Sequence, residues 1–152
     1  MRAAHIGALL LWVACALVFE ARLARARRRG PDAAWAERRR LHAVVALEHA
    51  ALAAALLLGW VAMRCHGWSV GQPRWLGVKL LVVGSLIVPL EAMHAYFTHV
   101  WIARGLGQAT DGSLPRDLER GIGMAEMVRA LEALLLGFAL PLIVWLSVRR
   151  PF

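Results

Sequence analysis

Three apolar stretches of the chain each carry a side chain that is costly to place inside a membrane. His49 stands in VALEHAAL, His94 in LEAMHAYF and Arg129 in MAEMVRAL. Imidazole nitrogens bind metal ions and haem iron, and a guanidinium binds carboxylates. Ionisable residues within membrane spans are rare and commonly mark functional sites. These three residues are therefore the first candidates for a cofactor site.

Carboxylates accompany two of these residues at helical spacing. Glu91 precedes His94 by three residues, so the two share one face of a helix. Glu126, Arg129 and Glu132 also step by three, which predicts a polar stripe along one side of a helix. Such a stripe must face protein or water, because each charged group that faced lipid would cost several kcal/mol.

Four apolar runs are long enough to hold these residues inside a membrane. Of the 152 residues, 60% are hydrophobic and 18% are charged, which exceeds the apolar share of a soluble domain. Each run approaches the ~20 residues that a helix needs to cross a bilayer. The runs cover residues 3–22, 41–63, 75–101 and 122–148. The sequence predicts an all-α integral membrane four-helix bundle, with residues 1–152 as a single domain because the connections are too short for a second core.

Arginine is concentrated between the first two runs. The formal charge is +8, and the connection ARLARARRRGPDAAWAERRR opposes a row of arginines with only Asp32 and Glu37. The positive-inside rule places this connection in the cytoplasm, which predicts a bacterial cytoplasmic (inner) membrane protein with both termini periplasmic. A cleavable signal peptide after Arg2 is the alternative and would move the connection to the other side. We expect the arginines to contact anionic lipid headgroups of the bilayer, and no nucleic acid.

The predicted orientation brings the two histidines and Arg129 to one depth. At ~1.5 Å per residue, His49 lies about 12 Å from the cytoplasmic end of its run, and His94 and Arg129 lie about 10 Å from theirs. Imidazoles on opposite helices at equal depth are the geometry that axial ligation of haem b requires. We therefore expect His49 and His94 to bind haem b, with Arg129 neutralising a propionate.

Two other interpretations of the polar cluster stay open. Glu91, His94 and His49 could form a carboxylate-rich metal site of the kind found in di-iron bundles, although Glu-x-x-His occurs here once rather than twice. Alternatively, the polar groups could pair with one another and hold the helices together. Interhelical hydrogen bonds in membranes average only about 0.6 kcal/mol, so structure alone is a weak reason for so many.

A second polar level lies near the opposite membrane face. His5 enters the first run, and Lys79, the one lysine of the chain, lies one turn into the third. A lysine near the end of a span commonly extends to the headgroups. As a functional group, Lys79 could hold an anionic substrate or serve as a second haem ligand. His5 is a further candidate for binding the cofactor.

Several segments resemble the small four-helix membrane proteins of the HemJ-type protoporphyrinogen IX oxidase and CopD-like superfamily. The first run has the His-Ile pair, the tryptophan seven residues after the histidine and the Arg-Leu pair of the HemJ opening. AERRRL resembles the Glu-Arg-Arg-Leu of that family, WLGVKLL resembles its Trp-Leu-x-x-Lys-Leu, and the chain ends in RPF. The matching residues are His5, Ile6, Trp12, Arg22, Leu23, Glu37, Arg38, Arg39, Leu41, Trp75, Leu76, Lys79, Leu80, Arg150, Pro151 and Phe152.

The resemblance implies a haem-binding redox protein, with protoporphyrinogen IX oxidation as the most concrete activity. His5 and Lys79 match a histidine and a lysine that are implicated in function in that family, so they are the candidate catalytic residues. Lys79 and the loop arginines would then hold propionates, and electrons would pass to a quinone or a respiratory-chain partner.

Two other functions stay open. Because neither of them is enzymatic redox chemistry, the sequence does not decide whether the chain is an enzyme. A CopD-like protein would handle copper through soft ligands, and the available methionines are Met63, Met93, Met124 and Met127. A non-catalytic accessory subunit would use the polar cluster to bind a membrane complex. Glycines at 59, 77 and 84 also permit close helix packing, in a homo-oligomer or within one chain.

Overall fold

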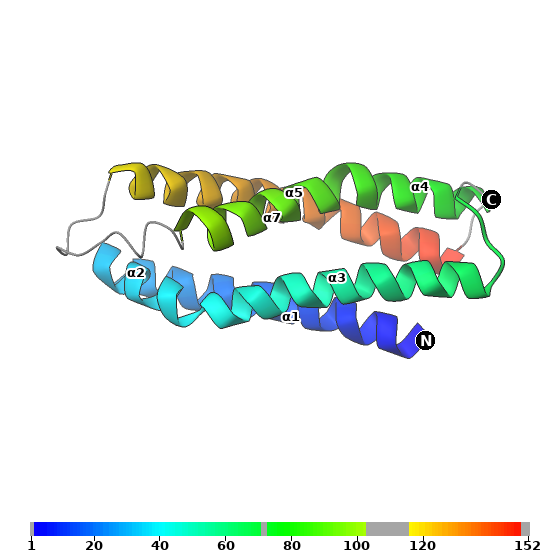
Figure 1. Ribbon diagram of the computed structural model, residues 1–152, viewed down its shortest axis with the longest axis horizontal. Helices are drawn as coiled ribbons and strands as arrows, with labels where there is room; N and C mark the ends of the chain where they lie inside the picture. Colours follow the sequence, from blue (N-terminus) through cyan, green and yellow to red (C-terminus); the bar gives the residue numbers. More distant parts are fainter. Residues whose placement is uncertain (1, 71–72, 103–115, 150–152) are drawn as a thin grey trace. The chain divides into compact units, whose positions relative to one another are not determined.

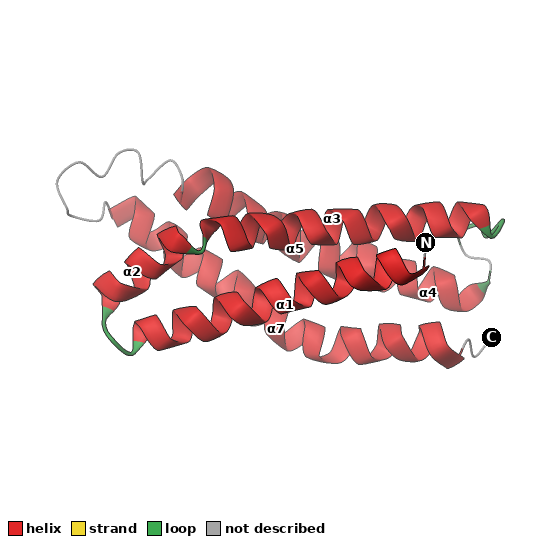
Figure 2. Cartoon of the chain, turned by 90° about the horizontal axis from the view of Figure 1, so that it is seen from below, coloured by secondary structure: helices red, strands yellow, loops and turns green. Residues whose placement is uncertain are grey.

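The described part of the computed structural model covers residues 2–70, 73–102 and 116–149, and its regular elements are all helices (Figure 2). The all-α fold class is therefore confirmed. The chain divides into two compact units, Met1–Trp68 and Ser69–Phe152, each a pair of long helices. That the two units act as a single domain stays a prediction.

The first unit is an antiparallel helix pair closed by a short helix. Helix α1 (Arg2–Arg27) packs along α3 (His42–Cys65), and α2 (Pro31–Arg40) connects them (Figure 1). The chain reverses at Gly30, whose φ of 122° is accessible to glycine, and Pro31 then starts α2 at the position where proline is tolerated best.

The arginine-rich connection is more helical than the sequence predicts. Helix α1 runs to Arg27, five residues past the expected end at 22, and residues 31–40 form α2 instead of a loop. Alanine, glutamate and arginine favour helix as strongly as leucine does, so an α-helix continues beyond the apolar run. The hydrophobic pattern marks where a span ends and says little about where the helix ends.

The second unit is also an antiparallel pair. One arm is a continuous helix made of α4 (Arg74–Val82), η1 (Val83–Ile87), α5 (Val88–Ala95) and η2 (Tyr96–Ile102). The other arm is α7 (Arg116–Arg149), which contacts all four segments (Figure 1). Helix α7 starts six residues before the predicted start at 122, again because charged helix formers extend it.

Two π-helical segments, η1 and η2, interrupt the first arm. Pro89 has no N–H to donate to the carbonyl four residues earlier, at Ser85, and its ring crowds that carbonyl. The chain widens there, and the N–H of Val88 donates to the carbonyl of Val83, five residues back. Pro89 is therefore the physical cause of η1, which lies just before the helix that carries Glu91 and His94.

Within the described residues, four helices are long and apolar enough to cross a membrane. They are Ala3–Arg27, His42–Cys65, Arg74–Val100 and Arg120–Val148. Large apolar side chains on all four are exposed, among them Leu17, Leu57, Leu81 and Phe138. Such extended apolar surface suits lipid rather than water. The chain is a multi-pass membrane protein, as the sequence predicts.

We expect Leu23→Ala to destabilise the first unit. Leu23 is 1% exposed and packs with Phe19, Leu41 and Val45, where α1 meets the start of α3. Loss of its side chain leaves a cavity that costs about 2–5 kcal/mol of unfolding free energy. Thermal unfolding in detergent measures the change, with Leu17→Ala as the matched control because Leu17 is 66% exposed on the same helix. Equal midpoints for the two variants would contradict this packing.

Candidate functional site

Buried polar residues are clustered along α5 and α7 of the second unit. Glu91 and His94 are 4% and 2% exposed on α5, and Arg129 and Glu132 are 9% and 5% exposed on α7. The Nη1 nitrogen of Arg129 is 3.1 Å from Nδ1 and 3.2 Å from Nε2 of His94. Two of the three residues expected at one depth, His94 and Arg129, are therefore in contact.

The geometry of this contact places Nη1 of Arg129 over the face of the His94 ring. One donor nitrogen is almost equally distant from both ring nitrogens. The two ring nitrogens direct their lone pair or N–H along diverging lines in the ring plane, so one atom cannot lie on both lines. A nitrogen above the ring face, a side of an aromatic ring that arginine commonly contacts, satisfies both distances. The contact therefore does not use the in-plane direction along which an imidazole nitrogen binds a metal.

The charges of this cluster are unequal. Arg129 remains charged in proteins and supplies one positive charge, whereas Glu91 and Glu132 supply two buried carboxyl groups and Glu126 is half-buried on the same helix as Arg129. A charge in a low-dielectric interior must be compensated by a partner, a proton or a bound ion. The cluster is thus able to attract a cation as well as an anionic group near Arg129.

The π segments bracket the residues of this cluster on α5. η1 ends at Ile87 and η2 begins at Tyr96, so Glu91 and His94 lie in the single stretch of regular helix between them. π-helical segments occur frequently at functional sites, where they re-aim side chains. The sequence prediction missed them, and Pro89 was the signal that could have located the first.

His49 belongs to the other unit, on α3. It is half-buried, and the adjacent Glu48 is only 1% exposed. A glutamate so deeply buried in a membrane-length helix is the more unusual of the two residues. The pairing of His49 with His94 was predicted from their equal depth in the membrane, and it stays a prediction.

His5 fastens α1 to α3 within the first unit. Its Nδ1–H donates a 2.8 Å hydrogen bond to the carbonyl of Ala55, which assigns the proton to Nδ1 because a carbonyl can only accept. Gly59 makes room for the ring, since a Cβ there would lie 3.1 Å from Cε1 of His5. This is the close approach that a glycine on a membrane helix permits. The predicted catalytic role of His5 stays a prediction beside this structural one.

Lys79 fastens the two arms of the second unit at their other end. Its Nζ donates to Oγ of Ser147 at 3.2 Å, and that hydroxyl donates to the carbonyl of Ile143 at 2.7 Å. The ammonium lies beside the last turns of α7, where the helix dipole favours a positive charge. Ser147 was not singled out from the sequence, because a serine in an apolar run gives no pattern of its own. The catalytic role predicted for Lys79 is untested by this contact.

We expect Gly59→Ala to stabilise the first unit less than a glycine-to-alanine change at an open helix position, because of His5. The added methyl would displace the ring and lengthen the bond to Ala55, which removes about 1 kcal/mol of unfolding free energy and so offsets the gain in helix propensity that alanine brings. Gly7→Ala is the control, because nothing lies within 4 Å of a Cβ there. It should stabilise α1, by up to about 1 kcal/mol. In a His5→Ala background, thermal unfolding should show that the Gly59→Ala penalty is gone; persistence of the penalty would show that His5 is not its cause.

Comparisons with known proteins identify no relative, so the function has to be inferred from the residues of this chain. No family model, no curated protein and no solved structure matches the chain. The resemblance to HemJ-type and CopD-like proteins accordingly rests on the short matches at His5, Glu37 and Lys79 with their neighbours. It enters the proposal below as a resemblance only.

Proposed function

We propose that the chain is a membrane redox protein that binds haem b, with His94 as an axial ligand. The observation that carries the proposal is the buried imidazole of His94 in contact with the guanidinium of Arg129. Imidazole is the commonest protein ligand of haem iron, and arginine binds carboxylates such as haem propionates. A candidate ligand for haem iron and a candidate partner for a propionate thus lie side by side in one helix pair.

The residues fit such a group in chemistry and in direction. Arg129 touches the ring face of His94, so an in-plane ring nitrogen is the atom that would face iron. The guanidinium would hold a propionate or raise the local positive potential. Haem supplies one-electron transfer when it is bound. His49 as the second axial ligand, and HemJ-like oxidation of protoporphyrinogen IX with a quinone or respiratory partner as acceptor, are the most concrete forms of the proposal.

A metal ion is the second candidate, and a different observation favours it. Glu91 and His94 are both buried on one face of α5, and carboxyl groups outnumber Arg129 in the cluster. An imidazole and carboxylates are ligands for iron, zinc or manganese. Copper gains less support, because Met93, Met124 and Met127 are exposed on their helices, and Met63, the buried one of the four candidate methionines, lies on α3 of the first unit. The three exposed methionines face outward and do not build an internal thioether site.

The absorption spectrum of the purified protein separates these candidates. We expect a sharp alpha band in the reduced-minus-oxidised spectrum, and loss of most of the bound haem in His94→Ala because the iron loses its ligand. His66→Ala is the control, since His66 is exposed just after α3, in the first unit, and its Nδ1 lies 2.7 Å from the carbonyl oxygen of Ala62 one turn earlier. Arg129→Gln should keep haem but lower its reduction potential, because a nearby positive charge favours the reduced form. Colourless protein that retains a metal would support the second candidate, and colourless protein without metal would contradict both.

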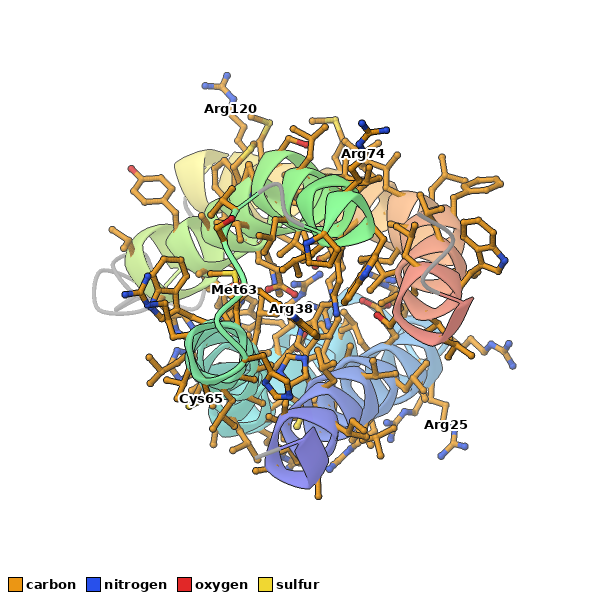
Figure 3. All side chains as sticks on the ribbon, turned by 90° about the vertical axis from the view of Figure 1, so that its right-hand side faces the viewer. Arg25, Arg38, Met63, Cys65, Arg74 and Arg120 are labelled. Carbon is orange, nitrogen blue, oxygen red and sulfur yellow. The ribbon has the colours of Figure 1, made fainter. Side chains whose placement is uncertain are left out.

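We propose further that the protein lies in a bacterial inner membrane with both termini periplasmic. The support is the arginine-rich stretch that joins α1 to α3, since such stretches stay in the cytoplasm. Cys65, at the far end of α3, is then periplasmic. Figure 3 shows Cys65 and Met63 on different sides of α3, and Cys65 is exposed whereas Cys15 is buried.

A membrane-impermeant thiol reagent tests this orientation. We expect it to label Cys65 in intact spheroplasts, because the thiol is exposed at the periplasmic end of α3. Cys65→Ser should abolish the labelling, and Cys15 should not replace it. Labelling in inverted vesicles but not in spheroplasts would reverse the proposed orientation.

A further inference from the structure

A pocket lined by arginines lies at the end of the first unit where α1 meets α2. Its volume is about 260 Å³, and its lining residues are Arg22, Arg25, Arg29, Glu37 and Arg40. Four guanidinium groups face one carboxylate, so the lining carries a net charge of +3. The haem proposal does not involve this pocket, which belongs to the first unit alone.

Glu37 organises the pocket. Its side chain is 7% exposed, and its Oε1 lies 2.6 Å from Nε of Arg22 while Oε2 lies 3.9 Å from Nη1 of Arg40. The buried carboxylate therefore holds Arg22 in place and compensates one of the four positive charges. The pocket is a built arrangement around a buried anchor and not only a run of surface arginines.

Arg25 and Arg29 supply the uncompensated charge. Within the described residues, neither forms an ion pair, and Arg25 extends away from the helix backbone (Figure 3). Guanidinium groups bind phosphate through paired N–H donors, which is the reason that arginine clusters recognise phosphates. The pocket is smaller than the 300–1,000 Å³ typical of sites for drug-sized ligands, so it suits a single anionic group.

The position of the pocket favours a lipid as the source of that group. Arg22, Arg25 and Arg29 follow the apolar part of α1, on which Leu17 and Val18 are exposed and Phe19 is buried. Lipid phosphates lie at the level where a span leaves the hydrocarbon, and anionic headgroups attract arginines there. We propose that this pocket is a binding site for a phosphate-bearing anion, with the headgroup of an anionic phospholipid as its occupant in the membrane.

The test compares two double variants of the full-length protein in detergent. Arg25→Gln/Arg29→Gln removes the uncompensated charges from the pocket, and Arg64→Gln/Arg74→Gln removes two exposed arginines that do not line it. Thermal unfolding is followed while phosphatidylglycerol, zwitterionic phosphatidylcholine or inorganic phosphate at constant ionic strength is added. Circular dichroism checks that each variant is folded.

We expect phosphatidylglycerol to raise the unfolding temperature of the wild type and of the Arg64/Arg74 variant. The Arg25/Arg29 variant should need at least about tenfold more lipid for the same rise in unfolding temperature, because it loses charge-assisted hydrogen bonds to the phosphate. Stabilisation by inorganic phosphate as well would show that the phosphate group suffices, and stabilisation by lipid alone would assign the site to a headgroup. Equal responses of the two double variants to phosphatidylglycerol would overturn the proposal. Loss of bound haem from the Arg25/Arg29 variant alone would also overturn it, because that result would assign these arginines to haem propionates.

Discussion

The cost of a charged group in a membrane span is the constraint on which the second unit depends. Arg129 cannot lose its charge, so its place in a membrane-length helix requires a polar partner. The ring of His94 supplies one such contact within the second unit. Interhelical polar contacts stabilise membrane proteins only weakly, so a purely structural role is a weak reason for these buried groups. The proposed haem would use both the imidazole and the guanidinium.

The two helix pairs position polar groups by different devices. In the second unit, π segments before and after α5 isolate a short regular helix that carries Glu91 and His94. In the first unit, the side chain of His5 enters the space left by Gly59 and binds a backbone carbonyl. Lys79 and Ser147 close the far end of the second pair in a similar way. Polar contacts thus hold each pair together near its ends, while apolar surface faces the lipid.

Much of the fold could be predicted from hydrophobic run length, and much of the site could not. The four spans and the shared face of Glu91 and His94 follow from spacing alone. Helix α2 escaped prediction because an arginine-rich helix has no apolar run, and the contact of Arg129 with His94 depends on the rotation of two helices, which depth does not determine. The pocket around Glu37 could not be predicted either, because it forms only when α1 and α2 pack against each other.

The central claim is that the imidazole of His94 binds haem iron. Pulsed electron paramagnetic resonance of the oxidised protein, prepared with nitrogen-15 histidine, measures directly whether a histidine nitrogen is coupled to the iron. If His94 binds the iron, we expect a ferric haem signal with strong coupling to histidine nitrogen, which disappears when His94 is replaced by alanine. A protein without a haem signal, or a haem signal whose histidine coupling survives that replacement unchanged, would contradict it.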